Sequence, residues 1–195
     1  MSQNIEIEFK NMLTESEFNI LLKHFSLNES HFFKQVNHYF DTPDFSLKQH
    51  GCNLRIREKK DGYEMTLKQP HPDGLLESNE KLDKKTAQSL IAGAPLTDGT
   101  IKEQLLRMDI KIDRLLFFGS LETKRATVDY QGGEMALDCS TYLNMQDYEV
   151  EYEVTERLTG EAIFVQLLSE VKIPLRKAKN KVQRFYERKL SLETQ

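Results

Sequence analysis

Two glutamates and a lysine alternate with apolar residues near the start of the chain, in residues 5–10. Side chains in a β-strand point alternately to the two faces of the sheet, so this alternation predicts a strand with Glu6, Glu8 and Lys10 on one face. Two carboxylates and an ammonium in one row could hold a divalent cation together with the anion that it carries. For this stretch alone, an ordinary strand with its charges in solvent is the alternative interpretation.

The same alternation returns along the chain, and the sign of the charge changes from one segment to the next. Residues 52–59 place Arg55 and Arg57 on one face of a strand, whereas residues 148–154 place three glutamates on one face. Like charges in a confined space are costly unless a ligand neutralises them. A metal between the carboxylates and a polyanion among the cations would neutralise both rows together.

The segments that must position these rows indicate an α+β fold. About eight mainly antiparallel strands have one apolar and one charged face, and the helices have single apolar stripes, one beginning at a capping box of Thr14 and Glu17. We expect a closed antiparallel eight-stranded β-barrel, or tunnel, with a polar charged lumen and helices covering the outside, in a single domain of residues 1–195. The alternative is an amphipathic sheet with one solvated face. Thr159 is expected to cap a later helix, and a basic helix is expected from about Lys177.

The residue types favour one kind of chemistry. Glu and Asp without Cys or His ligands suit Mg²⁺ or Mn²⁺, and Arg and Lys donors suit phosphate oxygens. A glycine-rich phosphate loop is missing from the sequence, and so is any evident Ser–His or Cys–His pair, so a covalent intermediate is not expected. The remaining reaction class is metal-assisted in-line attack of water on phosphorus.

Composition narrows the choice of partners. The 195 residues include 31 acidic and 27 basic side chains, and the net charge of −4 argues against a general nucleic-acid binder. An apolar run near 18 residues and a signal-peptide pattern are both missing, so we expect a cytoplasmic protein without a membrane segment. Cys52 and Cys139 are interpreted as free thiols.

Several motifs in order resemble the CYTH domain, the triphosphate tunnel metalloenzyme superfamily. Glu6-x-Glu8-x-Lys10 matches the defining ExExK motif of that superfamily, and Asn180 replaces serine in the terminal SKxxR element. The other matching elements are Tyr39-Phe40-Asp41-Thr42, Leu54-Arg55-Ile56-Arg57, Thr66-Leu67-Lys68, Arg125, Asp138, Glu149-x-Glu151-x-Glu153 and Asn180-Lys181-Val182-Gln183-Arg184. The match is most similar to the small stand-alone CYTH proteins of Gram-positive bacteria.

The resemblance implies a set of site residues. It implies that the metals are held by carboxylates, namely Glu6, Glu8, Asp138, Glu151 and Glu153. It implies that the triphosphate is bound by cations, namely Lys10, Arg55, Arg57, Lys68, Arg125, Lys181 and Arg184. The residues expected to be catalytic are Glu6, Glu8, Lys10, Glu151 and Glu153. One departure is that the Arg-x-Glu often found in the fifth strand appears as Ser78-Asn79-Glu80, which suggests a missing tunnel cation.

The leading hypothesis is a Mg²⁺- or Mn²⁺-dependent hydrolase of inorganic, nucleoside or thiamine triphosphate. Cyclisation of ATP to cyclic AMP is the enzymatic alternative, and a polyphosphate- or nucleotide-binding module without turnover is the other. The sequence assigns no oligomeric state and no role to four further charged residues, Glu77, Glu80, Lys124 and Glu149.

Overall fold

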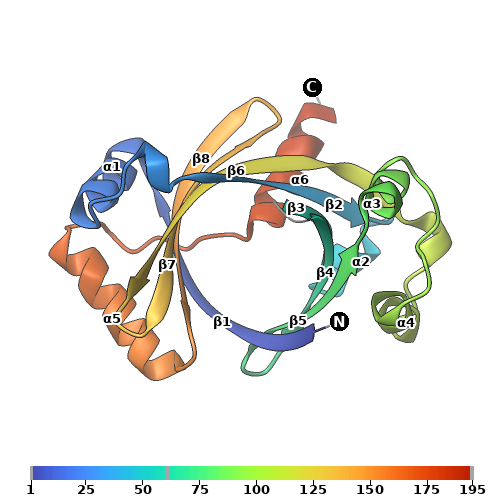
Figure 1. The fold of residues 1–195 in the computed structure, drawn as a ribbon, viewed down its shortest axis with the longest axis horizontal. Coiled ribbons are helices and arrows are strands. Elements are labelled where there is room, and N and C mark those ends of the chain that lie inside the picture. Colours follow the sequence, from blue (N-terminus) through green and yellow to red (C-terminus); the bar gives the residue numbers. More distant parts are fainter. Residues whose placement is uncertain (1, 60–61, 194–195) are drawn as a thin grey trace. The chain divides into compact units, whose positions relative to one another are not determined.

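The computed structural model describes residues 2–59 and 62–193, which form eight strands and six α-helices. The strands are β1 (Ser2–Leu13), β2 (Phe33–Asp41), β3 (Asn53–Lys59), β4 (Gly62–His71), β5 (Gly74–Leu82), β6 (Leu116–Tyr130), β7 (Gly133–Tyr142) and β8 (Met145–Val154). The helices are α1 (Glu15–His24), α2 (Ser46–Gln49), α3 (Lys84–Ile91), α4 (Thr100–Arg107), α5 (Arg157–Glu170) and α6 (Lys181–Glu193), with 3₁₀ turns η1 (Glu29–His31) and η2 (Ile112–Arg114). Figure 1 labels these elements.

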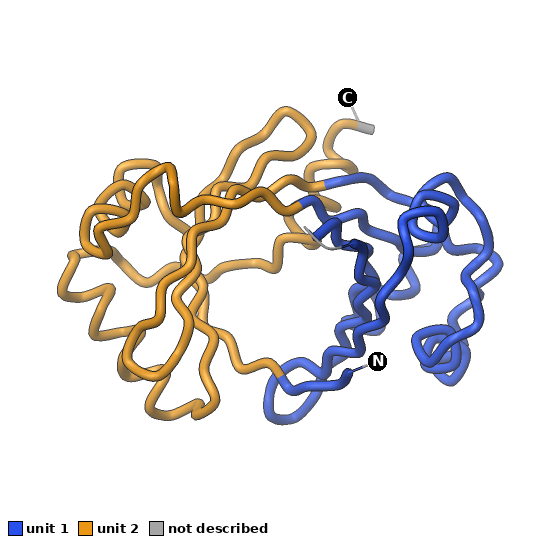
Figure 2. Tube along the Cα trace, in the orientation of Figure 1, with its two compact units in different colours: residues 1–5, 36–120 blue, residues 6–35, 121–195 orange. Residues whose placement is uncertain are grey.

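The strands form one closed barrel in the order β1-β5-β4-β3-β2-β6-β7-β8. Consecutive strands of the β3–β4–β5 and β6–β7–β8 segments pair antiparallel, and β8 also pairs antiparallel with β1. The predicted α+β class and closed eight-stranded antiparallel barrel are therefore confirmed. The chain divides into two compact units, which Figure 2 shows in different colours: unit 1 is residues 1–5 and 36–120, and unit 2 is residues 6–35 and 121–195. The single domain of residues 1–195 stays a prediction.

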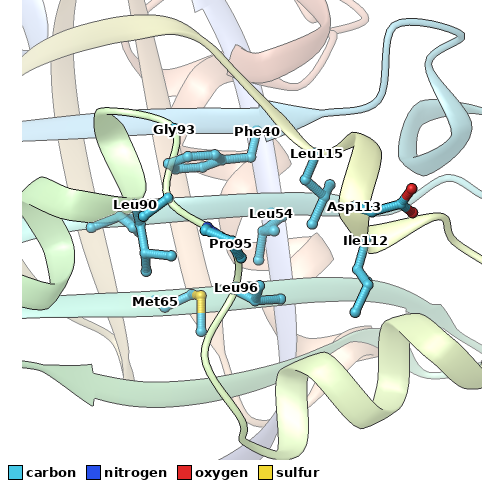
Figure 3. A pocket seen from close by; sticks show the side chains of 12 residues that line it. Phe40, Leu54, Met65, Leu90, Gly93, Pro95, Leu96, Ile112, Asp113 and Leu115 are labelled. Atoms are coloured by element: carbon cyan, nitrogen blue, oxygen red, sulfur yellow. The ribbon is translucent and has the colours of Figure 1, made fainter.

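Unit 1 has an apolar sheet face that packs against α3 and α4. Leu54 and Met65 from the sheet, Ala87 from α3 and Ile101 from α4 belong to one buried cluster. Within this layer lies a cavity of about 190 Å³. Figure 3 shows its apolar lining, with the carboxylate of Asp113 directed away from the other side chains.

Unit 2 has an apolar sheet face that packs against α1 and α5, which lie on the same side of β7 and β8 in Figure 1. Helix α1 begins at the predicted capping box: Thr14 accepts from the backbone of Glu17, and the Glu17 side chain accepts from the backbone of Thr14. The predicted cap at Thr159 is wrong, because α5 begins at Arg157 with Glu156 at its N-cap.

The closing helix begins later than expected. Residues 171–180 have no helix or strand, and α6 starts at Lys181 rather than near Lys177. Lys177 therefore does not share a helix side with Lys181. Val182, Phe185 and Tyr186 are buried as predicted, whereas Leu190 is 37% exposed, so the apolar stripe ends before the helix does. Over the described ranges, the helices are too short or too polar to cross a membrane.

Candidate functional site

The charged face of unit 2 follows from strand register. Glu151 on β8 lies opposite Lys10 on β1, and Glu149 on β8 lies opposite Asp138 on β7. Asp138 in turn lies opposite Arg125 on β6. Because alternate residues of a strand share a face, these opposing positions bring four strands' charged residues onto one side of the sheet. The apolar residues between them face the helices α1 and α5.

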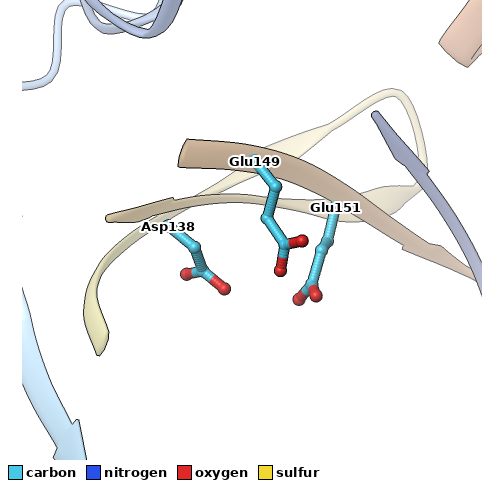
Figure 4. Close-up of side chains that lie close together, drawn as sticks. All are labelled: Asp138, Glu149 and Glu151. Atoms are coloured by element: carbon cyan, nitrogen blue, oxygen red, sulfur yellow. The ribbon is translucent and has the colours of Figure 1, made fainter. Parts of the chain in front are cut away.

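Three carboxylates form a buried acidic cluster: Asp138, Glu149 and Glu151. Each offers an oxygen that lies within 4.8 Å of the others. The three residues are only 0%, 1% and 8% exposed. Figure 4 shows their carboxylates on the same side of β7 and β8, directed toward one region. Removing three carboxylates from water is costly, so positive charge must lie nearby.

Lys181 and Arg125 supply that charge. The Lys181 ammonium lies 2.7 Å from Asp138 and 2.6 Å from Glu151, and it also pairs with Glu149. Arg125 donates to both oxygens of Asp138, at 2.7 Å from Nε and 2.5 Å from a terminal nitrogen, and also donates to Glu151. Burial opposes ionisation of Asp138, but Lys181 and Arg125 outweigh it and hold its pKa well below the usual range. Burial and the neighbouring Glu8 instead raise the pKa of Glu151.

The ExExK glutamates lie on this face but outside the acidic cluster. Glu8 pairs with Lys10, whose ammonium is 4.0 Å from Glu151. Burial lowers the pKa of Lys10, but the carboxylates of Glu8 and Glu151 outweigh burial and raise it. Glu153 lies opposite Glu8 on β8 and is exposed. Of the five predicted metal ligands, the acidic cluster contains Asp138 and Glu151; it does not contain Glu6, Glu8 or Glu153.

Arg184 binds two carboxylates. Its Nε lies 2.9 Å from Asp147, and a terminal nitrogen lies 2.7 Å from Glu149. Tyr142 also donates to Asp147, at 2.7 Å. The sequence motifs do not include Asp147, and they assign no role to Glu149. A signal was present, because the alternation of acidic residues in β8 runs back from Glu151 through Glu149 to Asp147.

Unit 1 carries a basic group on the face of its sheet that does not pack against α3 and α4. The group consists of Arg55, Arg57 and Lys68. Lys68 lies 2.5 Å from Glu77, and Arg55 lies 3.9 Å from the same carboxylate. Arg57 donates from Nε to Asn37 at 2.8 Å. Glu77 is 9% exposed, and its pKa is lowered because Lys68 and Arg55 outweigh the effect of burial. Glu77 therefore holds two of the three predicted phosphate ligands of unit 1.

The fifth strand explains the Ser78-Asn79-Glu80 departure. Ser78 accepts from Gln104 on α4 at 2.9 Å, and a Glu80 oxygen accepts from the backbone of Ile101 at 2.8 Å. Both side chains thus lie on the helix side of β5. A cation at position 78 would not lie on the charged face, so the interpretation of a missing tunnel cation is wrong. Glu80 caps the N-terminus of α4 instead.

Lys124 contributes to neither charged face. It lies opposite Cys139 on β7, one residue before Arg125, and is exposed. Neighbouring residues of a strand point to opposite faces, so Lys124 lies on the side of the sheet away from Asp138. Cys139 and Cys52 are free thiols, as predicted.

The donor set of the acidic cluster fits a hard divalent cation. All three of its members are carboxylates. Mg²⁺ and Mn²⁺ prefer such oxygen ligands, whereas structural zinc sites use mainly Cys and His. The residues present therefore fit the metal that the motifs imply.

Known proteins resemble this chain in sequence and in fold. The Bacillus subtilis (strain 168) protein named "Putative triphosphatase YjbK" is 46% identical over 189 residues, which cover 97% of this chain and 98% of that protein. The crystal structure of a "putative adenylate cyclase" from Bacillus halodurans has a TM-score of 0.92 at 39% identity, and the match covers 95% of this chain and all of the other. A Hippeastrum protein described as a "putative adenylyl cyclase" with a dominant triphosphatase activity has a TM-score of 0.77 at 22% identity, over 94% of this chain and 96% of the other, which shows a shared fold.

A family model described as the CYTH domain matches residues 4–186. The match begins just before the ExExK motif and ends within α6, so it includes both the carboxylates of β7 and β8 and the cations of α6. Together with the 46% identity over nearly the whole length, it shows that this chain belongs to the CYTH domain family.

Proposed function

We propose that the protein is a Mg²⁺- or Mn²⁺-dependent hydrolase of triphosphate compounds. The observation that carries the proposal is the buried acidic cluster of unit 2, with lysine and arginine side chains directly against it. Carboxylates for a metal and cations for phosphate oxygens on one face are the groups that hydrolysis of a phosphoric anhydride requires. The CYTH match and the named B. subtilis relative support the same reaction.

Asp138, Glu149 and Glu151 are the proposed core of the metal site, with Glu6, Glu8 and Glu153 as the further ligands that the motifs imply. When bound, a divalent ion neutralises phosphate charge and lowers the pKa of a coordinated water. The protein's own contribution is to hold these carboxylates close together, while Lys181 and Arg125 keep the pKa of Asp138 below its usual range.

Each unit carries its own set of proposed phosphate ligands: Lys10, Arg125, Lys181 and Arg184 in unit 2, and Arg55, Arg57 and Lys68 in unit 1. Many of their nitrogens already contact carboxylates. When a triphosphate binds, these cations must therefore exchange protein carboxylates for phosphate oxygens. Such an exchange favours ligands with several negative charges over a monoanion, because each cation needs a replacement partner.

The cyclase alternative rests on the B. halodurans relative, which is described as a putative adenylate cyclase. A cyclase must also bind adenine and activate the ribose hydroxyl, and the motifs assign no residues to these tasks. A binding module without turnover would need the same cations and carboxylates. Product analysis separates the three functions.

The test is incubation with inorganic triphosphate, ATP and thiamine triphosphate under Mg²⁺ or Mn²⁺, resolving orthophosphate, pyrophosphate and cyclic AMP. We expect orthophosphate from at least one substrate, and none after EDTA. Cyclic AMP with pyrophosphate would establish the cyclase instead, and binding without product would establish the module. We further propose a small-molecule substrate, no general nucleic-acid binding and a cytoplasmic location.

A further inference from the structure

Asn11 is a fully buried amide on the helix side of β1, one residue after Lys10. Its nitrogen donates to the carbonyl of Pro174 at 3.1 Å, and its oxygen accepts from the backbone N–H of Arg176 at 2.5 Å. The side chain thus pairs with two backbone groups of residues 171–180, the connecting segment between α5 and α6. A buried amide used in this way fixes the segment against the strand, because Asn11 would lose these partners while still buried if the segment moved away.

Arg176 fixes the same segment a second time. Its two terminal nitrogens donate to the two oxygens of Glu17 on α1, at 2.7 and 2.8 Å, and one of them also donates to the carbonyl of Met12 at 3.1 Å. Paired donors of an arginine on a carboxylate give a rigid geometry that a single ion pair lacks. Glu17 is itself oriented by the capping box with Thr14.

The connecting segment leads directly into α6. Lys181, the first residue of that helix, lies five residues after Arg176, and Arg184 lies one turn further on. These two cations contact the acidic cluster and Asp147. The ten residues before α6 have no helix or strand, so the contacts that hold them contribute to the place of α6, together with the buried Val182, Phe185 and Tyr186 of the helix itself.

We propose that Asn11 and the Arg176–Glu17 pair are positioning residues that hold Lys181 and Arg184 against the carboxylates of β7 and β8. This inference rests on the proposed function for its effect on catalysis, but the positioning itself is a property of the free protein. Asn11 and Arg176 would act only through the position of α6, and neither is proposed to contact the metal or the substrate.

The first test measures the position of α6 without any substrate. Arg176→Ala removes the paired hydrogen bonds to Glu17. Asn11→Ala is a second variant, which removes the side-chain hydrogen bonds to the backbone of Pro174 and Arg176. Amide hydrogen exchange in residues 177–193 is expected to rise at least tenfold, while exchange in β7 stays as in the wild type. Reaction of the Lys181 amine with an acetylating reagent, followed by mass spectrometry, is expected to rise several-fold, with the Lys10 amine unchanged. Lys34→Ala, which removes the ion pair with Glu122 in the same unit, is the matched control and should change neither.

The second test measures catalysis with inorganic triphosphate. In Arg176→Ala, KM is expected to rise three- to tenfold with kcat within twofold of the wild type, and KM should depend less steeply on salt because fewer cations contact the phosphates. In Arg176→Lys, which keeps the positive charge, the rise in KM should be smaller than in Arg176→Ala. Unchanged exchange in α6, an equal rise in all parts of unit 2, or a loosened α6 with unchanged KM would each overturn the proposal. A wild type without triphosphatase activity would refute the proposed function, and the exchange and acetylation results would then decide the positioning by themselves.

Discussion

Both units carry a sheet with one charged face and one helix-covered face, but the two charged faces have opposite imbalances. In unit 1, three cations, Arg55, Arg57 and Lys68, lie on the same face as the buried carboxylate of Glu77. In unit 2, carboxylates outnumber cations on the described contacts, which are made by Glu8, Asp138, Asp147, Glu149 and Glu151 with Lys10, Arg125, Lys181 and Arg184. The first face suits an anion directly, and the second suits a cation.

The two faces also differ in where their cations come from. Those of unit 1 are all strand residues, whose positions follow from sheet register. In unit 2, Lys181 and Arg184 come from α6, so their positions depend on a helix that the connecting segment must hold. The position of a strand-borne donor therefore follows from local sequence alternation, whereas a helix-borne donor needs tertiary attachments such as those of Asn11 and Glu17.

Asp138→Asn should have the largest effect. The variant removes the carboxylate that Lys181 and Arg125 hold ionised, and breaking a buried pair by removing one partner costs about 3–5 kcal/mol of unfolding free energy. Loss of a metal ligand is expected to lower kcat on the order of 100-fold or more. Urea unfolding and initial-rate kinetics measure the two effects. Wild-type stability in this variant would contradict the assigned ion pairs.

Arg55→Ala in unit 1 should be less severe and different in kind. Losing a hydrogen bond to a charged group costs about 1.5–3 kcal/mol, so KM for inorganic triphosphate should rise about 10- to 150-fold. Divalent-cation affinity should stay as in the wild type, because Arg55 contacts no member of the acidic cluster in the described contacts. Loss of metal binding in Arg55→Ala would erase the distinction between the two faces.

Glu77→Gln tests the basic group by changing the carboxylate that pairs with its cations. The change removes the carboxylate that competes with phosphate for Lys68 and Arg55. Triphosphate affinity, measured by calorimetry at low salt, should increase a few-fold, and the increase should shrink as salt screens the added charge. Weaker binding would instead show that Glu77 is needed to orient the two cations. Gln69→Glu, a nearby change of opposite charge on β4, is the matched control, and we expect it not to strengthen binding.

Glu17→Gln should give the smallest effect, visible mainly in the pH dependence of stability. Arg176 lowers the pKa of Glu17 from 4.5 to about 2, and hydrogen bonds from Thr14 add to this. Since the folded pKa is depressed, the stabilisation is present above pH 4.5 and is lost as the pH falls toward about 2. The difference in unfolding free energy between wild type and variant should therefore shrink over that range. A constant difference between pH 6 and pH 3 would contradict the pairing.

The sequence alternation was sufficient to predict the strands, the barrel and the charged rows, because a period of two directly reports which residues share a face. The capping box of Thr14 and Glu17 was likewise a local signal. The contact partners of individual charged residues were not predictable from the sequence. The contact of Glu80 with the N-terminus of α4, for example, follows only from the register of β5. Asn11 gave no signal, since the residues that it holds, Pro174 and Arg176, lie more than 160 residues away. The start of α6 was misplaced because the basic residues before Lys181 suit a helix as well as an extended segment.

The most direct test of the division between the two charged faces is a measurement of Mn²⁺ binding without substrate. Electron paramagnetic resonance would monitor this binding in the wild type, Asp138→Asn and Arg55→Ala. We predict that the wild type and Arg55→Ala bind Mn²⁺ with equal affinity and that Asp138→Asn loses at least tenfold. Equal binding by all three proteins would contradict the assignment of the metal to the acidic cluster of unit 2.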